Sequence, residues 1–361
     1  MRYSIYPTKD ATIYDQYIYK NTGLDEVIEL SKTVSSSNSI ENYISRILMK
    51  FDTNEITDYL ASSNAINPKY FLNLYTLDVK EIPLTYNILI LPVSQSWEMG
   101  IGKSTDSPET TDGVSWTYRN TYEGEQWATG SYATDSTGSY SNYSGGGTWY
   151  TNYNVTQSYD FEDTDIKVDI TNIVNAWLSG SISNDGIIIK RSIDDEQSGA
   201  YMGQLQFFSR DTHTIYPPKL EIAWDDSSYT TGSLTLLNSD DSFLIYSPNI
   251  ESSYNELTKA KIRIIGRLKY PIRTYSTQSV YTTVSHCLPS SSYYSIVDAM
   301  TKDIVIPFDE NYTKISCDEN GNYFKFWMNS LQTERIYKIL IKVILPETEE
   351  IFDDFIFKVV E

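Results

Sequence analysis

The sequence predicts an all-β protein made of two tandem β-sandwich domains, and three observations lead to this fold class. Alternating apolar and polar residues recur along most of the 361 residues, separated by clusters of Gly, Asn, Asp, Ser and Pro, as in short antiparallel strands. The 31 tyrosines and the abundant Ser, Thr and Asn favour strands over helices. The chain is too long for one sandwich and suits two, since domains usually hold about 100–200 residues.

The domains are predicted at residues 1–226 and 233–361. The boundary is placed at Asp225–Gly232, a polar segment without apolar periodicity that follows a strand ending at Trp224. After this segment the strand pattern resumes. We therefore expect each domain to have its own core.

One short helix is expected in the first domain, within Asp169–Gly180. Thr171 is placed to cap its start and Gly180 its end. The apolar residues that fall at helical spacing are Ile170, Val174, Trp177 and Leu178. The helix is expected to plug one end of the first sandwich.

A long insertion is predicted at about residues 104–154, where the chain is rich in Ser, Thr, Gly and Tyr. A solvated linker would avoid tryptophan, so the rings of this segment should dock on the sandwich, on a partner subunit or on a ligand. The candidate contact residues are Trp116, Tyr118, Trp127 and Trp149. Contacts between subunits are favoured over carbohydrate stacking for these rings.

Two local patterns characterise the second domain. Asn320-Gly321 lies between two predicted strands and is the signature of a type I′ hairpin. Leu331 precedes Tyr337 by six residues at the start of a strand, which is the spacing of a tyrosine corner; an ordinary core tyrosine is the alternative. Together these patterns predict an immunoglobulin-like sandwich.

Charge and hydropathy exclude two classes of partner. The formal net charge of −20 and the sequence pI near 4.5 repel phosphate backbones, and no local cluster of Lys and Arg offsets this charge, so no nucleic-acid binding is expected. No apolar run approaches the roughly 18–20 residues that cross a bilayer, and the first residues carry no signal-peptide core, so no membrane insertion is expected.

The groups needed for catalysis are scarce. His213 and His286 are the only histidines and are expected to be structural, whereas Cys287 and Cys317 are expected to be reduced and buried. No phosphate-binding loop or catalytic triad order is present. Carboxylates near tryptophans are interpreted as solvated surface groups: Glu98, Glu123 and Glu125. No enzymatic activity and no cofactor are predicted.

An acidic run before residue 166 offers oxygen ligands for a structural Ca²⁺ ion. The candidates are Asp160, Asp163 and Asp165, beside Glu162. A charged turn before the next strand is the favoured alternative, and Asp194-Asp195-Glu196 is interpreted in the same way.

The order of motifs from about Asp10 to Trp224 resembles the carbohydrate-binding-module-like sandwiches labelled DNRLRE. The motifs that carry the resemblance are Asp10–Tyr14, Asn21–Gly23, Ser45–Asp52, Tyr70–Tyr75, Val93–Glu98, Trp116, Asp169–Gly180, Asn184–Ile189, Phe207–Arg210 and Pro217–Ile222. The resemblance implies a jelly-roll-type sandwich for the first domain. The long insertion departs from the usual connection of that family, which weakens the implication of a family sugar site.

Two segments also resemble structural proteins of marine T4-like and gut crAss-like phages. They are Ile13–Leu30 and Tyr323–Ile344. The resemblance implies a virion component assembled in the bacterial host cytoplasm, in a tail, neck or collar ring, a fibre or a capsid accessory position. Other virion proteins and further copies of the chain would then be its partners.

A second hypothesis remains open beside this one. The chain would be a host-glycan-binding adhesin, or a carbohydrate-binding module associated with a depolymerase. A host surface glycan would then be its partner, bound through the aromatic residues of the insertion.

Overall fold

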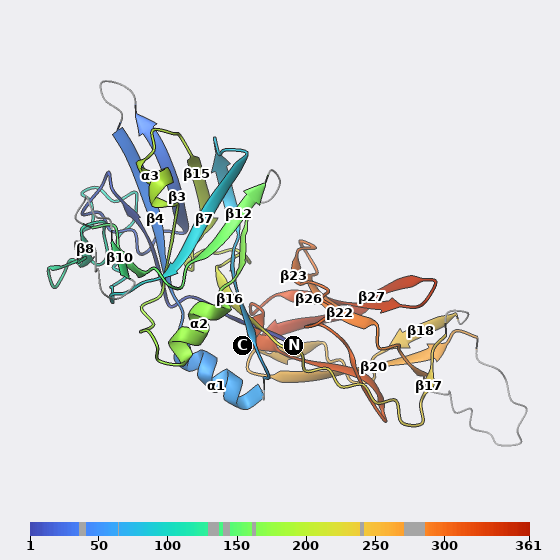
Figure 1. Cartoon of the computed structure of the whole chain (residues 1–361). Helices are drawn as coiled ribbons and strands as arrows, with labels where there is room; N and C mark the ends of the chain where they lie inside the picture. The colour runs from blue at the N-terminus through green and yellow to red at the C-terminus, as the bar shows by residue number, and fades with distance from the viewer. Residues whose placement is uncertain are drawn as a thin grey trace, which may run out of the picture. The chain divides into compact units, whose positions relative to one another are not determined.

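The computed structural model describes residues 1–35, 41–63, 65–128, 137–139, 145–160, 164–238, 242–270 and 286–361. The all-β prediction is confirmed, because strands make up 46% of the described residues and helices only 8%. Figure 1 shows the strands. Two compact units are present. We call them the N-terminal unit (Ile5–Asn64 and Lys69–Glu221) and the C-terminal unit (Met1–Ser4, Ala65–Pro68 and Ile222–Glu361).

The grouping of Met1–Ser4 differs from the predicted span of 1–226 for the first domain. The amino group of Met1 donates a hydrogen bond to the carbonyl of Trp224 at 2.5 Å and pairs with Asp226 at 2.9 Å. The backbone N–H of Ser4 donates to Ser330 Oγ at 3.3 Å. The first residues are thereby tied to the C-terminal unit.

The N-terminal unit is built on two large sheets. The eight-stranded sheet has the order β12-β7-β14-β4-β3-β15-β6, with β2 paired to β4. Its strands are β2 (Lys9–Tyr14), β3 (Val27–Ser35), β4 (Glu41–Lys50), β6 (Thr76–Lys80), β7 (Thr85–Pro92), β12 (Val155–Asp160), β14 (Ile187–Lys190) and β15 (Gly203–Phe208). The four-stranded sheet has the order β1-β16-β5-β13, and its strands β5 (Lys69–Leu74) and β13 (Ile166–Asp169) lie in this unit. Most of β1 (Arg2–Ile5) and the end of β16 (Lys219–Ala223) are residues grouped with the C-terminal unit.

The predicted insertion contributes two small ribbons. These are β8 (Tyr118–Asn120) with β9 (Glu125–Gln126), and β10 (Thr137–Ser139) with β11 (Thr148–Tyr150). Its tryptophans join a buried cluster with aliphatic residues of β2, β4, β7 and β14. The cluster is formed by Ala11, Ile13, Ile44, Leu48, Leu91, Val93, Trp97, Val114, Trp116, Trp127, Trp149 and Ile188. The insertion is therefore part of the hydrophobic core of the unit.

The predicted helix is confirmed as α2 (Thr171–Leu178), which buries Val174 and Trp177. Its ends differ in part from the prediction. Ile170 occupies the N-cap position, and the hydroxyl of Thr171 accepts a hydrogen bond from the backbone of Tyr70 at 3.0 Å, so the predicted Thr171 cap is wrong. Gly180 follows the last turn with a φ of 73°, a conformation that favours glycine at a helix end.

Two further helices in this unit were not predicted. They are α1 (Thr53–Ser63) and α3 (Ile193–Gln197). The segment Asp194-Asp195-Glu196 was interpreted as a charged turn, but it forms α3, whose N-cap residue Ser192 accepts a hydrogen bond from Asp195 N at 3.0 Å. A helix of five residues is too short to show a helical period in sequence.

The C-terminal unit is a sandwich of two facing sheets. The first has the order β17-β21-β20-β25-β24, with β18 paired to β20; its strands are β17 (Thr235–Leu236), β18 (Phe243–Tyr246), β20 (Lys259–Leu268), β21 (His286–Cys287), β24 (Ser316–Asp318) and β25 (Gly321–Trp327). The second has the order β19-β27-β26-β22-β23, with β19 (Ser253–Asn255), β22 (Ser292–Asp298), β23 (Ile304–Ile306), β26 (Ile336–Ile344) and β27 (Glu349–Val360). A 3-10 turn, Met328–Ser330, follows β25.

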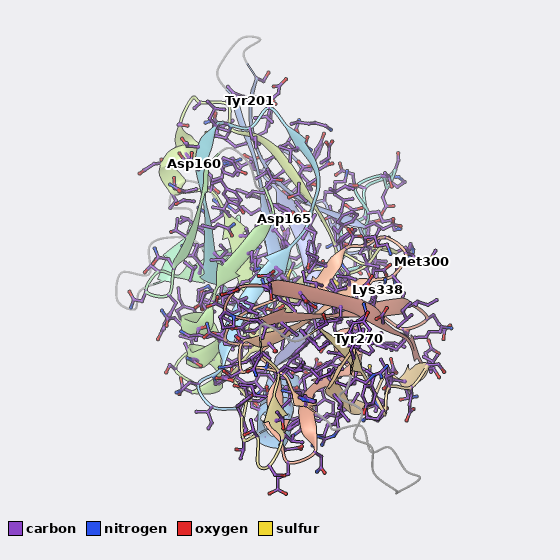
Figure 2. All side chains as sticks on the ribbon, turned by 90° about the vertical axis from the view of Figure 1, so that its right-hand side faces the viewer. Asp160, Asp165, Tyr201, Tyr270, Met300 and Lys338 are labelled. Carbon is purple, nitrogen blue, oxygen red and sulfur yellow. The ribbon has the colours of Figure 1, made fainter. Side chains whose placement is uncertain are left out.

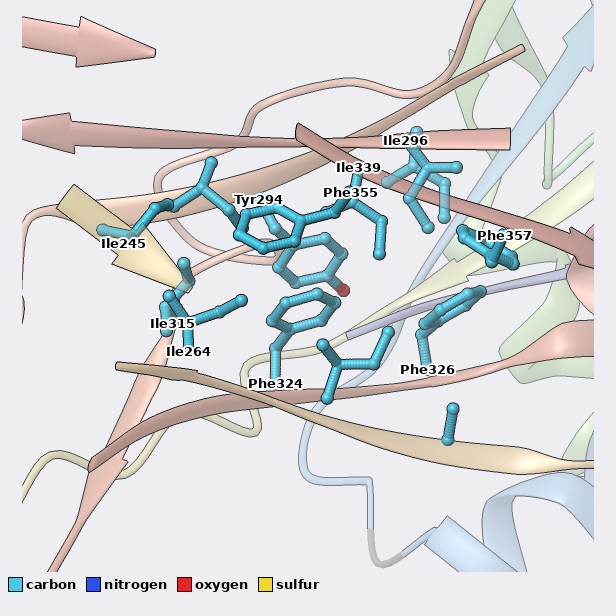
Figure 3. Close-up of a cluster of buried hydrophobic side chains, with 14 of the residues drawn as sticks. Ile245, Ile264, Tyr294, Ile296, Ile315, Phe324, Phe326, Ile339, Phe355 and Phe357 are labelled. Carbon is cyan, nitrogen blue, oxygen red and sulfur yellow. The ribbon is translucent and has the colours of Figure 1, made fainter. Parts of the chain in front are cut away.

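The inner faces of these two sheets meet in an aromatic and aliphatic core (Figure 3). Tyr294 of β22 stacks on Phe324 of β25 with ring centroids 4.3 Å apart. Phe326 of β25 meets Phe357 of β27 edge to face at 5.9 Å. The outer faces of the two sheets therefore point away from each other.

The tyrosine corner is confirmed in this unit. Tyr337 is 2% exposed, and its hydroxyl donates to the carbonyl of Gln332 at 3.1 Å. The predicted hairpin also forms, with Asp318 paired to Gly321, but its turn type differs. Neither loop residue, Glu319 nor Asn320, has a positive φ, whereas a type I′ turn needs positive φ at both. Gly321, with a φ of 113°, supplies the positive φ directly after the loop.

Candidate functional site

A buried cluster of three charged side chains lies at the centre of the N-terminal unit. Arg46 of β4 donates to Glu196 of α3 through Nε to Oε1 at 3.0 Å and through Nη2 to Oε2 at 2.7 Å. Lys190 of β14 pairs with the same carboxylate at 3.2 Å. Arg46 and Glu196 have no exposed surface, and Lys190 is 1% exposed. Burial and the nearby guanidinium of Arg46 lower the pKa of Lys190 to about 8, against the opposing effect of Glu196.

Two tryptophans of the insertion line this cluster. The guanidinium carbon of Arg46 lies 4.9 Å from the ring centroid of Trp116 and 5.3 Å from that of Trp149. Lys190 Nζ lies 5.2 Å from the Trp149 centroid. Cation–π contacts of this kind gain strength when water is excluded. The rings therefore shield and stabilise buried cations.

Gly146 brings the backbone of the insertion against Arg46. Its carbonyl accepts a hydrogen bond from Arg46 Nη1, and its φ is 80°. A Cβ at this position would lie 2.7 Å from Arg46 Nη1 and 2.8 Å from a ring carbon of Trp116. Only glycine allows this approach, which explains part of the glycine run in the insertion.

The three tryptophans predicted as contact residues are inside the unit. Trp116 and Trp149 are each 3% exposed and Trp127 is 1% exposed. Trp127 Nε1 donates to Ser115 O at 3.0 Å, so its polar edge is also satisfied. Docking on the chain's own sandwich is thus the alternative that the structure supports, and a subunit or carbohydrate contact has no exposed ring face here. Tyr118 differs, since it is half-buried and lies 6.0 Å from the Tyr19 ring.

The calcium candidates do not converge. Asp163 lies outside the described residues. Asp165 Oδ1 accepts a hydrogen bond from Thr76 N at 2.7 Å, which engages it in the fold, whereas Asp160 is exposed (Figure 2). Among the described residues no group of three His, Cys, Asp or Glu side chains is arranged to hold a metal ion.

The two cysteines and two histidines lie apart from the buried charged cluster and form no catalytic or metal-binding group among the described residues. Cys287 and Cys317 are free and buried, as predicted. Burial and the neighbouring Cys287 raise the pKa of the Cys317 thiol to about 12, which keeps it protonated. His286 is buried in β21, and His213 is exposed.

A small aromatic and polar cavity of about 200 Å³ lies on the N-terminal unit. It is lined by Tyr14, Asp15, Gln16, Tyr17, Glu29, Ser31, Thr33, Tyr43, Ile44 and Gln204. The Tyr14 and Tyr17 rings meet edge to face at 6.5 Å. Burial raises the pKa of Asp15 to about 6, although the Ile44 backbone N–H donates to its carboxylate at 2.7 Å. The cavity thus combines aromatic rings with hydrogen-bonding groups.

A cationic face covers the outer side of β20 and β25 in the C-terminal unit. We define it by Lys259, Lys261, Arg263, Tyr323, Lys325 and Trp327, which alternate with core residues along the two strands. Lys261 Nζ lies 3.9 Å from the Tyr323 centroid and Lys325 Nζ lies 5.6 Å from it. Lys259 Nζ lies 4.9 Å from the Trp327 centroid.

This face corrects the premise that no local cluster of Lys and Arg exists. Strand β20 supplies cations at every second position and β25 adds Lys325, so the full cluster forms only when the strands pair in register, with Lys261 opposite Lys325. The period-2 spacing Lys259-x-Lys261-x-Arg263 was the available signal in sequence.

The outer side of the opposite sheet carries exposed aliphatic residues. Ile336 of β26 is 41% exposed, and Ile351 and Ile356 of β27 are 53% and 52% exposed. The cross-strand register places Ile356 beside Lys338 and Ile351 beside Lys342. Figure 2 labels Lys338 of this sheet, together with Met300, which is 78% exposed.

Comparisons with known proteins identify no family. No family model and no curated protein matches the chain. Among solved structures it is similar to the apo structure of Bacteroides uniformis beta-glucuronidase 3, with 9% identity and a TM-score of 0.17. That alignment covers 81% of this chain and 27% of the other, so the chain spans about a quarter of that structure. A likeness this weak carries no argument about activity.

Among the helices that the structure describes, none is long and apolar enough to span a bilayer.

Proposed function

We propose that the chain is a structural subunit of a tailed-phage virion that acts through protein contacts, in a tail, neck or collar ring or as an accessory protein. The observation that carries the proposal is the exposed aliphatic row on β26 and β27. Ile336, Ile351 and Ile356 lie on the outer face of a sheet, where a solvated sandwich would place polar residues. Exposed apolar groups gathered on one face typically mark protein interfaces.

The use of buried charge in the N-terminal unit supports a structural role. The carboxylate of Glu196 is fully buried, and its two oxygens are paired with Arg46 and Lys190. A general base or nucleophile needs access to substrate, which a fully buried and fully paired carboxylate lacks. The buried cluster of Arg46, Glu196 and Lys190 therefore holds elements of the unit together and is not placed to act on a substrate.

The assignment to a virion rests on the two sequence segments that resemble phage structural proteins. One of them, Tyr323–Ile344, contains the three residues that β25 contributes to the cationic face and the whole of β26. The resemblance thus covers surface residues as well as core residues. This supports a shared mode of assembly.

Native mass spectrometry of the purified full chain tests the proposal. We expect a defined homo-oligomer that weakens at least tenfold in affinity when Ile351→Ser and Ile356→Ser are combined, because each loses apolar contact area. The control is Leu257→Ser, a residue of the same unit that is 75% exposed but lies outside this row. A chain that is monomeric at all concentrations and absent from purified particles would overturn the proposal.

The aromatic cavity favours a second candidate, a glycan-binding module. Sugars pack their apolar faces on aromatic rings and hydrogen-bond to carboxylates and amides, and Tyr14, Tyr17, Glu29 and Gln204 supply these groups. Tyr17 is 43% exposed, so one ring face is accessible.

A glycan array with host polysaccharides tests this second candidate. Binding should be lost in Tyr17→Ala and in Gln204→Ala. It should persist in Asn175→Ala, which changes a separate cavity of about 480 Å³ beside α2. Absence of binding to every host polysaccharide would dismiss the candidate.

A further inference from the structure

The cationic face is an unusual feature in a chain with a net charge of −20. It holds four cations and is balanced internally by one carboxylate, Asp318, which accepts hydrogen bonds from Arg263 Nη1 at 2.6 Å and Nη2 at 2.9 Å. Lys261 also reaches Asp318, at 3.2 Å. An excess of positive charge therefore remains on this face.

The internal arrangement of the face is unfavourable without a partner. Lys261 lies directly opposite Lys325 in the strand register, and like charges in that position destabilise a sheet. Both ammonium groups share the Tyr323 ring. The pKa of Lys259 is lowered by burial and by Lys325. An anion placed over the face would relieve this repulsion.

The complementary charge is found on the same unit, at the hairpin that joins β26 and β27. We define the acidic hairpin as residues 347–354, which include five exposed carboxylates: Glu347, Glu349, Glu350, Asp353 and Asp354. Glu349 pairs with Lys342 at 3.0 Å and Asp353 with Lys338 at 2.8 Å. The other three carboxylates form no ion pair with any residue that the structure describes.

The two surfaces belong to opposite sheets of one sandwich. The cationic face is the outer side of the sheet that contains β20 and β25, and the acidic hairpin extends the sheet that contains β26 and β27. The inner faces of these sheets are packed on each other. The cationic face therefore points away from the acidic hairpin of its own chain, so that the two meet only between molecules.

We propose that the cationic face binds the acidic hairpin of a second copy of this chain, in a head-to-tail contact. Two complementary patches at different places on one molecule form a heterologous contact, which closes into a ring or continues as a filament. Tyr323 and Trp327 supply aromatic contact area within the face, and Ile351 supplies an exposed aliphatic side chain on the hairpin. This contact rests on the proposed function and names the surfaces that perform it.

A single-stranded nucleic acid is the competing occupant, since it also combines negative charge with stacking groups. Asp318 within the face and the net charge of −20 oppose a phosphate backbone and a carboxylate hairpin alike, so charge does not separate the two occupants. The second copy is favoured because a phosphate backbone has no aliphatic side chain to place on the face. The acidic hairpin, by contrast, offers carboxylates with their own aliphatic anchor.

Charge-reversal complementation tests the contact. The first variant combines Lys259→Glu, Lys261→Glu and Lys325→Glu; the second combines Glu347→Lys, Glu350→Lys and Asp354→Lys. By mass photometry in low salt, each variant alone should associate at least tenfold more weakly than the unchanged chain. An equimolar mixture should recover mixed dimers, because the second variant keeps the native cationic face and the first keeps the native acidic hairpin. The two altered surfaces also carry opposite charges, so a contact of reversed polarity can form as well.

A matched control and a folding check accompany the variants. Lys69→Glu, Lys103→Glu and Lys167→Glu make the same change in net charge as the first variant, on exposed residues of the N-terminal unit, and should leave association unchanged. Circular dichroism establishes that each variant is folded.

The outcomes separate this inference from the proposed function. If the unchanged chain oligomerises but both charge variants do so equally well, the head-to-tail contact is overturned and the structural role stands. If a fluorescent single-stranded oligonucleotide binds the unchanged chain but not the first variant, while both variants oligomerise as well as the unchanged chain, the face binds nucleic acid and not a second copy. A chain that neither oligomerises nor occurs in particles overturns both.

Discussion

Glu196 shows how the N-terminal unit uses a buried charge. Its carboxylate joins β4, β14 and α3 through Arg46 and Lys190, and the indole rings of Trp116 and Trp149 close the cluster. A buried ion pair of this kind is weak evidence of net stability, yet the loss of one partner is costly because the other charge stays buried. Glu196 is therefore a structural residue. It holds the guanidinium of Arg46 in place, and the insertion packs against that guanidinium.

Replacing Glu196 by Gln should destabilise the N-terminal unit by about 3–5 kcal/mol, because Arg46 and Lys190 would remain buried without a carboxylate. Urea denaturation followed by tryptophan fluorescence measures the change, since Trp116 and Trp149 report on this cluster. Asp194→Asn, an exposed position of the same helix, is the control and should change stability by less than about 0.5 kcal/mol. A Gln variant as stable as this control would contradict the structural role.

Asp10 predicts a specific dependence of stability on pH. Burial raises its pKa to about 7, although the backbone N–H of Arg210 donates to the carboxylate at 2.7 Å. A carboxyl whose pKa is raised on folding contributes stability that is fully present below its unfolded pKa of about 3.9 and is lost as pH rises through about 7. The unchanged protein should therefore lose stability between about pH 4 and 7 at this site.

Asp10→Asn should remove that loss. From pH 4 to pH 8 the unfolding free energy of the variant should rise by about 2–4 kcal/mol relative to the unchanged protein. Denaturant titrations at several pH values measure the difference, with the exposed Asp58→Asn as control. The same pH profile for the Asn variant and the unchanged protein would show that Asp10 does not titrate in this range.

Several residues of the sequence motifs have structural roles that explain the motifs. The side-chain amide of Asn21 donates to the carbonyls of Met99 and Val114, each at 2.8 Å, and its oxygen accepts from Gly102 N at 2.8 Å. The Trp97 indole donates to Asp185 O at 2.9 Å. These motif residues hold distant segments together. Sequence alone identified the residues, but their partners lie about 80 positions away and were visible only in the fold.

Among the elements, the strand pattern was the most predictable. Strict alternation identified β26 and the end of β27, because one face of each is core. The same pattern identified β16, but all five residues of that strand are buried, so its expected solvated face is wrong. Helix α2 was found from its apolar spacing. By contrast α3 is set by its cap at Ser192 and by the burial of Glu196, and the latter depends on the position of β4. A side chain that is charged in sequence gives no local sign that it will be buried.

The tyrosine corner makes a prediction at this scale. Tyr337→Phe removes the hydroxyl that donates to Gln332 O but keeps the buried ring, so the C-terminal unit should lose about 0.5–1.5 kcal/mol. Chemical denaturation monitored by circular dichroism provides the measurement. Tyr293→Phe, a half-buried residue of β22, is the matched control. A loss no larger than that of the control would mean that Tyr337 is an ordinary core tyrosine.

For the whole molecule, the all-β class followed from the sequence, whereas the distribution of charge did not. The total of −20 describes the chain at long range, but strand pairing gathers cations on β20 and β25. The carboxylates of the hairpin between β26 and β27 are already adjacent in the sequence. Likewise, the tryptophans of the insertion were candidates for contact because they are large and apolar. They proved to be core residues, packed with aliphatic side chains of the sheet, and Trp116 and Trp149 also cover the buried cations of Arg46 and Lys190.

The proposal of a structural virion subunit is tested most directly by immunogold electron microscopy of intact phage particles whose genome is found to encode this chain, with antibodies against the C-terminal unit. The account predicts gold label at one fixed position on the particle, in the neck, collar, tail or capsid surface. Particles that label with a capsid antibody but carry no label for this chain, before and after mild disruption, would contradict it.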